Sequence, residues 1–96
     1  MVTLEQRYKK DPDVIARRVL GEMVLAPVRH DAGDAENVYV LNDTAEYAWE
    51  LIDGERTLGQ ILDAIVAEFE VEKEQAEGDL LELFTQLEEI QAVVPA

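Results

Sequence analysis

The 96-residue chain contains no cysteine and a single histidine, His30. Without cysteine there is no disulfide framework, no thiol nucleophile and no thiolate metal site. One histidine in a loop-like stretch is a poor basis for acid–base catalysis or metal binding. The sequence shows no nucleophile–base pair and no phosphate-binding loop. We therefore expect a protein that is not an enzyme and that needs neither metal nor cofactor.

Long apolar runs are also missing. No run approaches the roughly 18–20 residues that a membrane span needs, and residues 1–13 lack the apolar stretch of a signal peptide. The sequence thus predicts a cytoplasmic protein that does not bind membranes. The hydrophobic content of 48% is typical of a folded chain. A chain of this length makes one domain with one small core.

Basic residues are scarce, with eight Lys and Arg against 22 Asp and Glu, for a net charge of −14. They are also unevenly placed. Residues 1–30 hold six basic and four acidic side chains, whereas residues 31–96 hold two basic and 18 acidic ones. Nucleic-acid binding relies on Lys and Arg to neutralise phosphates, so this chain should not bind nucleic acid. Its acidic surface can keep it soluble or steer basic partners toward it.

The first part of the chain reads as an arm followed by strands. Residues 1–13 are polar and carry a turn signal at Asp11-Pro12-Asp13, so we interpret them as an N-terminal arm ahead of one domain at 14–94. β-rich runs then follow at 14–20 and 23–29 around a turn at Gly21-Glu22, which predicts a hairpin. A third short strand is expected at 38–41.

Helical signals take over after the third strand. Asn42 or Asp43 can cap the first helix, and Asp43 with Glu46 fits a capping box. Thr57 with Gln60 repeats the pattern before a second helix, and a third is expected from about Lys73 to Ile90, each with an apolar stripe at helical spacing. Trp49 falls on such a stripe and should belong to the core. The predicted fold is therefore α+β and winged-helix-like, with a three-stranded antiparallel sheet followed by three helices (βββααα).

These residues resemble the PqqD family, named for the pyrroloquinoline quinone biosynthesis protein D, and the wider class of peptide-recognition elements. The family pattern is a strand ending Leu-Asn, a small-residue helix start, an apolar helix ending Asp-Gly, an Arg-Thr helix entry and an Ala-x-x-Asp-Leu helix. The matching residues here are Leu41-Asn42, Thr44-Ala45, Trp49 to Gly54, Arg56-Thr57-Leu58, Ile61, Ala76 and Asp79-Leu80. The resemblance covers about 14–94.

The resemblance implies a non-enzymatic chaperone. Such proteins hold the leader segment of a ribosomally made precursor peptide and deliver it to a modifying enzyme, often a radical S-adenosylmethionine (SAM) enzyme. The leader would add as a strand to the third strand and lie against the third helix. Strand addition needs an open edge, and residues 38–41 carry no charged side chain that would protect one. The expected peptide-binding residues are Val38, Tyr39, Val40 and Leu41 on the strand, with Leu80, Leu83 and Leu87 on the opposite wall.

Two other functions compete with this one. A winged-helix transcription regulator would have a similar order of elements, but its recognition helix should carry Arg and Lys, and the helix at 73–90 carries only Lys73. A homodimeric scaffold protein could pair the same open edge with a second copy of itself. The sequence leaves open whether the protein is a monomer or a homodimer.

Overall fold

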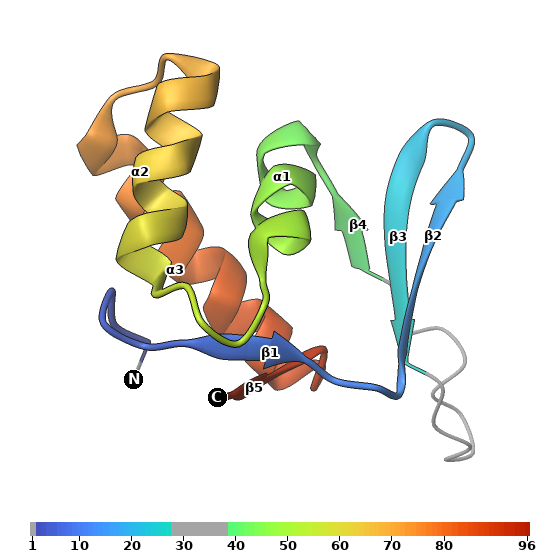
Figure 1. Ribbon diagram of the computed structural model, residues 1–96. Helices are drawn as coiled ribbons and strands as arrows, with labels where there is room; N and C mark the ends of the chain where they lie inside the picture. The colour runs from blue at the N-terminus through green and yellow to red at the C-terminus, as the bar shows by residue number, and fades with distance from the viewer. Residues whose placement is uncertain (1, 28–38) are drawn as a thin grey trace.

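A computed structural model of the protein describes residues 2–27 and 39–96 (Figure 1). Its elements follow one another as three strands and three helices, as the sequence predicted, with one further strand at each end. They are β1 (Tyr8–Lys10), β2 (Val14–Val19), β3 (Glu22–Pro27), β4 (Tyr39–Leu41), α1 (Asp43–Leu51), α2 (Leu58–Phe69), α3 (Lys73–Glu89) and β5 (Val93–Pro95). The predicted α+β class is confirmed.

The larger sheet is antiparallel, in the order β2-β3-β4. Val24 of β3 stands opposite Arg17 on one side and Val40 on the other. The β2–β3 turn consists of Leu20 and Gly21, one residue earlier than the sequence indicated. Both have positive φ, 52° and 85°, the combination that a two-residue type I′ turn requires. Figure 1 shows this hairpin standing apart from the helices.

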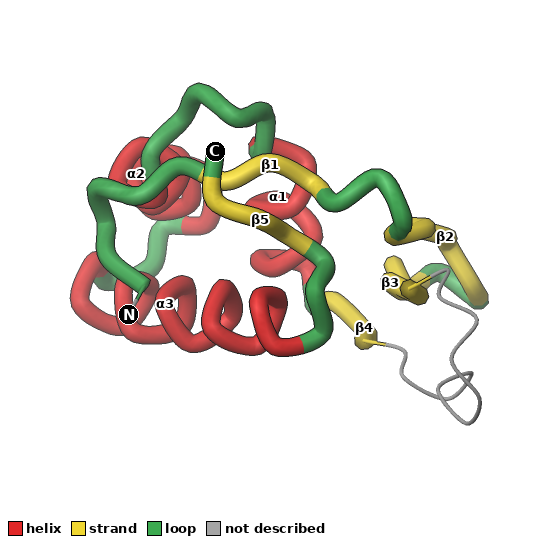
Figure 2. The backbone as a smooth tube through the Cα atoms, turned by 90° about the horizontal axis from the view of Figure 1, so that it is seen from below, coloured by secondary structure: helices red, strands yellow, loops and turns green. Residues whose placement is uncertain are grey.

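A second, two-stranded sheet joins the ends of the described chain. β1 pairs antiparallel with β5, so that Tyr8 lies opposite Pro95. The segment before β1 is also attached by backbone bonds, because the amide of Leu58 donates to the Gln6 carbonyl and the amide of Gly59 to the Leu4 carbonyl, at 2.9 and 2.8 Å. Figure 2 shows β1 and β5 side by side and crossing the helices. Residues 4–10 thus pack on the helical layer.

Tyr8 fixes this segment in place. Its side chain is only 2% exposed, and its ring lies 5.2 Å from that of Phe84 on α3. The Tyr8 hydroxyl donates a 2.8 Å hydrogen bond to the carboxylate of Glu88. Burial, together with this carboxylate, raises the pKa of Tyr8 well above its ordinary value. The aromatic ring therefore belongs to the core although its surroundings in sequence are polar.

The helices begin where the capping signals predicted. Asn42 caps α1, and its side chain accepts a 2.8 Å hydrogen bond from the amide of Ala45. The alternative box between Asp43 and Glu46 does not form, since Glu46 instead forms an ion pair with Arg18 of β2. The second capping box is confirmed, because Thr57 and Gln60 exchange bonds at the start of α2. α3 runs from Lys73 to Glu89, close to its predicted bounds.

One apolar core lies among the three helices and the inner face of β3–β4. Trp49 is 4% exposed and is a core residue, as predicted. Leu25 and Leu41 reach the core from β3 and β4, whereas no residue of β2 is buried. Among the described residues, no helix has the length and apolar character needed to cross a membrane.

Candidate functional site

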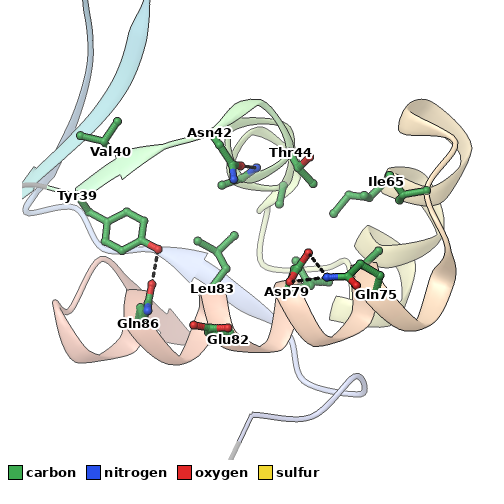
Figure 3. Close-up of a pocket in the computed structure, with 15 residues that line it drawn as sticks. Tyr39, Val40, Asn42, Thr44, Ile65, Gln75, Asp79, Glu82, Leu83 and Gln86 are labelled. Atoms are coloured by element: carbon green, nitrogen blue, oxygen red, sulfur yellow. Dashed lines mark hydrogen bonds between the residues drawn. The ribbon is translucent and has the colours of Figure 1, made fainter.

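The third strand of the larger sheet, β4, has one paired edge and one open edge. Its only neighbour in the described part of the chain is β3. Side chains alternate as the sequence predicted, with Leu41 buried and Val40 half exposed, at 3% and 51%. Tyr39 faces the same side as Leu41, toward α3 (Figure 3). An open edge of this kind presents backbone N–H and C=O groups to any extended chain beside it.

A cavity of about 330 Å³ opens beside β4, between this strand, the start of α1 and the outer face of α3. Its floor is apolar and comes from all three helices. The floor residues are Ala45, Ala48, Ile65, Ala76, Leu80 and Leu83. The three alanines leave room that larger side chains would fill. We call this space the β4–α3 groove, and Figure 3 shows its two walls facing one another.

The α3 wall of the groove carries a polar stripe above the apolar floor. Gln75, Asp79, Glu82 and Gln86 all line the cavity. Their spacing of i, i+4, i+7 and i+11 places them along one face of the helix. The Gln75 amide donates to both carboxylate oxygens of Asp79, at 3.4 and 3.3 Å. The α3 wall is therefore acidic along its outer rim and apolar at its base.

One hydrogen bond connects the two walls. The hydroxyl of Tyr39 donates to the side-chain oxygen of Gln86 (Figure 3). Burial and the nearby carboxylate of Glu82 raise the pKa of Tyr39 above its ordinary value, so this phenol stays a hydrogen-bond donor at neutral pH. The contact holds the open strand at a fixed distance from α3.

Seven residues were expected to bind a peptide, and the structure places them in different surroundings. Tyr39, Val40, Leu80 and Leu83 line the groove. Leu41 lies in the core beside it, and Leu87 is fully buried without lining the cavity. Val38 lies outside the described residues.

Sequence reasoning overlooked the polar stripe of α3. Only the leucines of this helix were assigned to the binding site from the sequence. The signal was available, because Gln75, Asp79, Glu82 and Gln86 share a face next to the leucine stripe. A polar face next to an apolar one is common to most surface helices. This face of α3 differs from the polar faces of other surface helices only because β4 lies opposite it.

The groove contains no catalytic constellation. No cluster of three or more His, Cys, Asp or Glu side chains in residues 2–27 and 39–96 is placed to hold a metal ion. His30 lies outside those residues. What the geometry offers is an open strand edge beside an apolar floor, and strand addition of an extended peptide uses these two features.

The fold and the groove define a winged-helix-like α+β domain with an accessible strand edge. Residues 22–93 match the family described as Coenzyme PQQ synthesis protein D (PqqD). This match spans most of the chain, which therefore belongs to the PqqD family, as its sequence predicted. Members of this family are non-catalytic peptide-binding domains, and the expected absence of enzyme activity follows from membership. No curated protein matches the chain.

Two solved structures share the fold. Lasso peptide synthetase B1 complexed with the leader peptide superposes with a TM-score of 0.75 and 26% identity, over 93% of this chain and 99% of that one. TbiB1 in complex with the TbiA(beta) leader peptide gives a TM-score of 0.71 at 22% identity, over 88% of this chain and 93% of that one. At 22% identity, the similarity to TbiB1 shows a shared fold alone.

Proposed function

We propose that this protein binds the leader segment of a ribosomally made precursor peptide by strand addition to β4. The leader lies in the β4–α3 groove with alternate side chains directed to the apolar floor, and the protein presents the peptide to a modifying enzyme of the radical SAM type. The protein itself performs no chemistry. Its contribution is to raise the local concentration of the substrate at the enzyme.

One observation carries the proposal, namely the open edge of β4 beside a cavity with an apolar floor. Backbone pairing supplies affinity that depends little on sequence, and the floor supplies selectivity. Strand edges without charged side chains are uncommon on monomeric proteins because they invite aggregation. Family membership and the two leader-bound structures of similar fold give independent support.

The decisive experiment replaces backbone amides of the peptide. Candidate leaders come from short reading frames beside the gene, and each is made in two forms, N-methylated at odd or at even residues. Strand addition uses every second amide, so one form should lose most of its affinity in fluorescence anisotropy and the other should bind like the parent peptide. If both forms bind like the parent, backbone pairing is not the mode of binding.

The same samples test the alternative of a homodimeric scaffold. In that case β4 pairs with a second copy of itself, and light scattering should show a dimer that no leader peptide dissociates. A leader-binding protein should instead show a mass increase equal to one peptide per chain. A persistent dimer without peptide uptake would replace the leader-binding proposal by the scaffold function.

A further inference from the structure

The groove has a charge as well as a shape, and this charge narrows the class of peptide that fits it. Of the described side chains that line the cavity, two are carboxylates, Asp79 and Glu82, and none is Lys or Arg. The apolar floor lies beside them, since Leu80 and Leu83 of the same helix line the same cavity. A ligand side chain that extends from the floor of the groove to its rim therefore contacts apolar residues along its stem and negative charge at its end.

Lysine and arginine side chains match a groove with an apolar floor and a negatively charged rim. Their stems of three or four methylene groups pack on apolar surface while the charged end remains in water. An acidic peptide residue at the same place would face two like charges, which is unfavourable at short range. A neutral apolar residue would leave the rim carboxylates without a partner from the ligand.

The geometry of an extended chain permits the contact. The stripe from Gln75 to Gln86 extends about 16 Å along α3, which is the length of about five residues of a strand. Inward-facing side chains of a bound strand recur about every 7 Å. One such side chain can thus enter the apolar floor while the next along the same face reaches Asp79 or Glu82.

We infer that the leader peptide bound in the groove carries a basic residue, two positions from an apolar anchor, whose cation pairs with Asp79 and Glu82. This inference rests on the proposed leader binding and adds the class of peptide that the site selects. The pair lies at the exposed rim, where ion pairs contribute modestly. The basic residue therefore contributes selectivity among peptides more than total affinity.

The test selects from a phage-displayed library of random peptides long enough to span the stripe. The wild-type protein should enrich peptides in which Lys or Arg stands two residues from an apolar side chain. Replacing that basic residue by Gln in a selected peptide should lower affinity about three- to fivefold, the upper range for an exposed pair.

Two double variants of α3 then assign the effect to the rim. Asp79→Asn with Glu82→Gln should abolish the difference between the Lys and the Gln peptide. Glu74→Gln with Glu89→Gln removes the same charge at exposed positions of α3 that do not line the cavity. This control should keep the full difference.

The outcomes separate the two proposals. Selected peptides without basic residues, or a Lys preference that survives in the Asp79/Glu82 variant, would overturn the inference and leave leader binding intact. Failure to select any peptide that competes at β4 would count against the proposed function itself.

Discussion

In the part of the chain that the structure describes, the larger sheet has two open edges, β2 and β4, and they differ in what surrounds them. β2 contains no buried residue and carries Arg17 and Arg18 in its middle. β4 is half as long, has no charged side chain, and is anchored by the buried Leu41. Charged residues on an edge strand discourage pairing with other chains. The backbone groups are the same at both edges, so the side chains decide which edge remains available.

The exposed apolar residues show the same division. The described chain has five large hydrophobic side chains at its surface. Ile15, Val19 and Leu20 lie on the β2 hairpin, and Val40 and Val71 line the β4–α3 groove. At the hairpin they flank Arg17 and Arg18, while at the groove they adjoin a cavity. Only the second arrangement gives an extended peptide both backbone partners and side-chain contacts.

The largest expected effect concerns the apolar core, to which β4 contributes Leu41, in comparison with the exposed turn of the β2 hairpin. Trp49 of α1 is buried and lies 5.1 Å from the Lys10 ammonium. Trp49→Ala should lower the free energy of unfolding by about 3–5 kcal/mol, a large part of the stability of a small domain. Leu20→Ala at the hairpin turn, where the side chain is 99% exposed, should change it by at most about 0.5 kcal/mol. Urea unfolding compares the two. Equal effects would show that Trp49 contributes no more to folding than the exposed hairpin turn.

The second prediction changes the backbone at each edge. Val40→Pro removes one N–H from β4 and distorts its edge, so leader affinity should fall at least about tenfold while the far-ultraviolet circular dichroism stays near that of the wild type. Ala16→Pro makes the matched change in β2, because Ala16, like Val40, directs its N–H to the open edge of the sheet. It should leave affinity within about twofold, because that edge does not receive the peptide. A folded Val40→Pro protein with unchanged affinity would exclude β4 as the binding edge.

The third prediction concerns the β2 hairpin turn. Leu20 has a φ of 52°, a left-handed conformation that costs a leucine roughly 1 kcal/mol or more. Leu20→Asn should therefore raise the free energy of unfolding by about 1 kcal/mol, since Asn tolerates this position of a type I′ turn. Leader affinity should not change. A loss of affinity at constant stability would instead give the β2 hairpin a role in binding.

The smallest effect is expected in the wall of the groove. Gly78 lies within α3, and a Cβ added there would meet no atom within 4 Å. Gly78→Ala should stabilise the protein by about 0.5 kcal/mol or slightly more through its higher helix propensity. Thermal melting measures this gain. A decrease in leader affinity in the same variant would place the bound peptide across the exposed side of Gly78.

Much of the helical half could be predicted, because its signals are local. Asn42 and Thr57 are capping residues, and their hydrogen bonds reach only three residues along the chain. The apolar spacing of the helices identified Trp49 as a core residue. The sequence left open whether Asn42 or Asp43 caps α1. In the structure Asn42 is the cap, and Glu46, which belonged to the alternative capping box, forms an ion pair with Arg18 of the distant strand β2.

The sequence by itself determined the class of fold, the bounds of the helices and the family, since each depends on short-range patterns. The tertiary structure decided three further features. It buried Tyr8 against Phe84, it paired β1 with β5 across nearly the whole chain, and it placed β4 opposite the polar stripe of α3. Each joins residues far apart in sequence, and strands of three residues carry too little pattern to reveal their partners. The groove exists only where those distant segments meet.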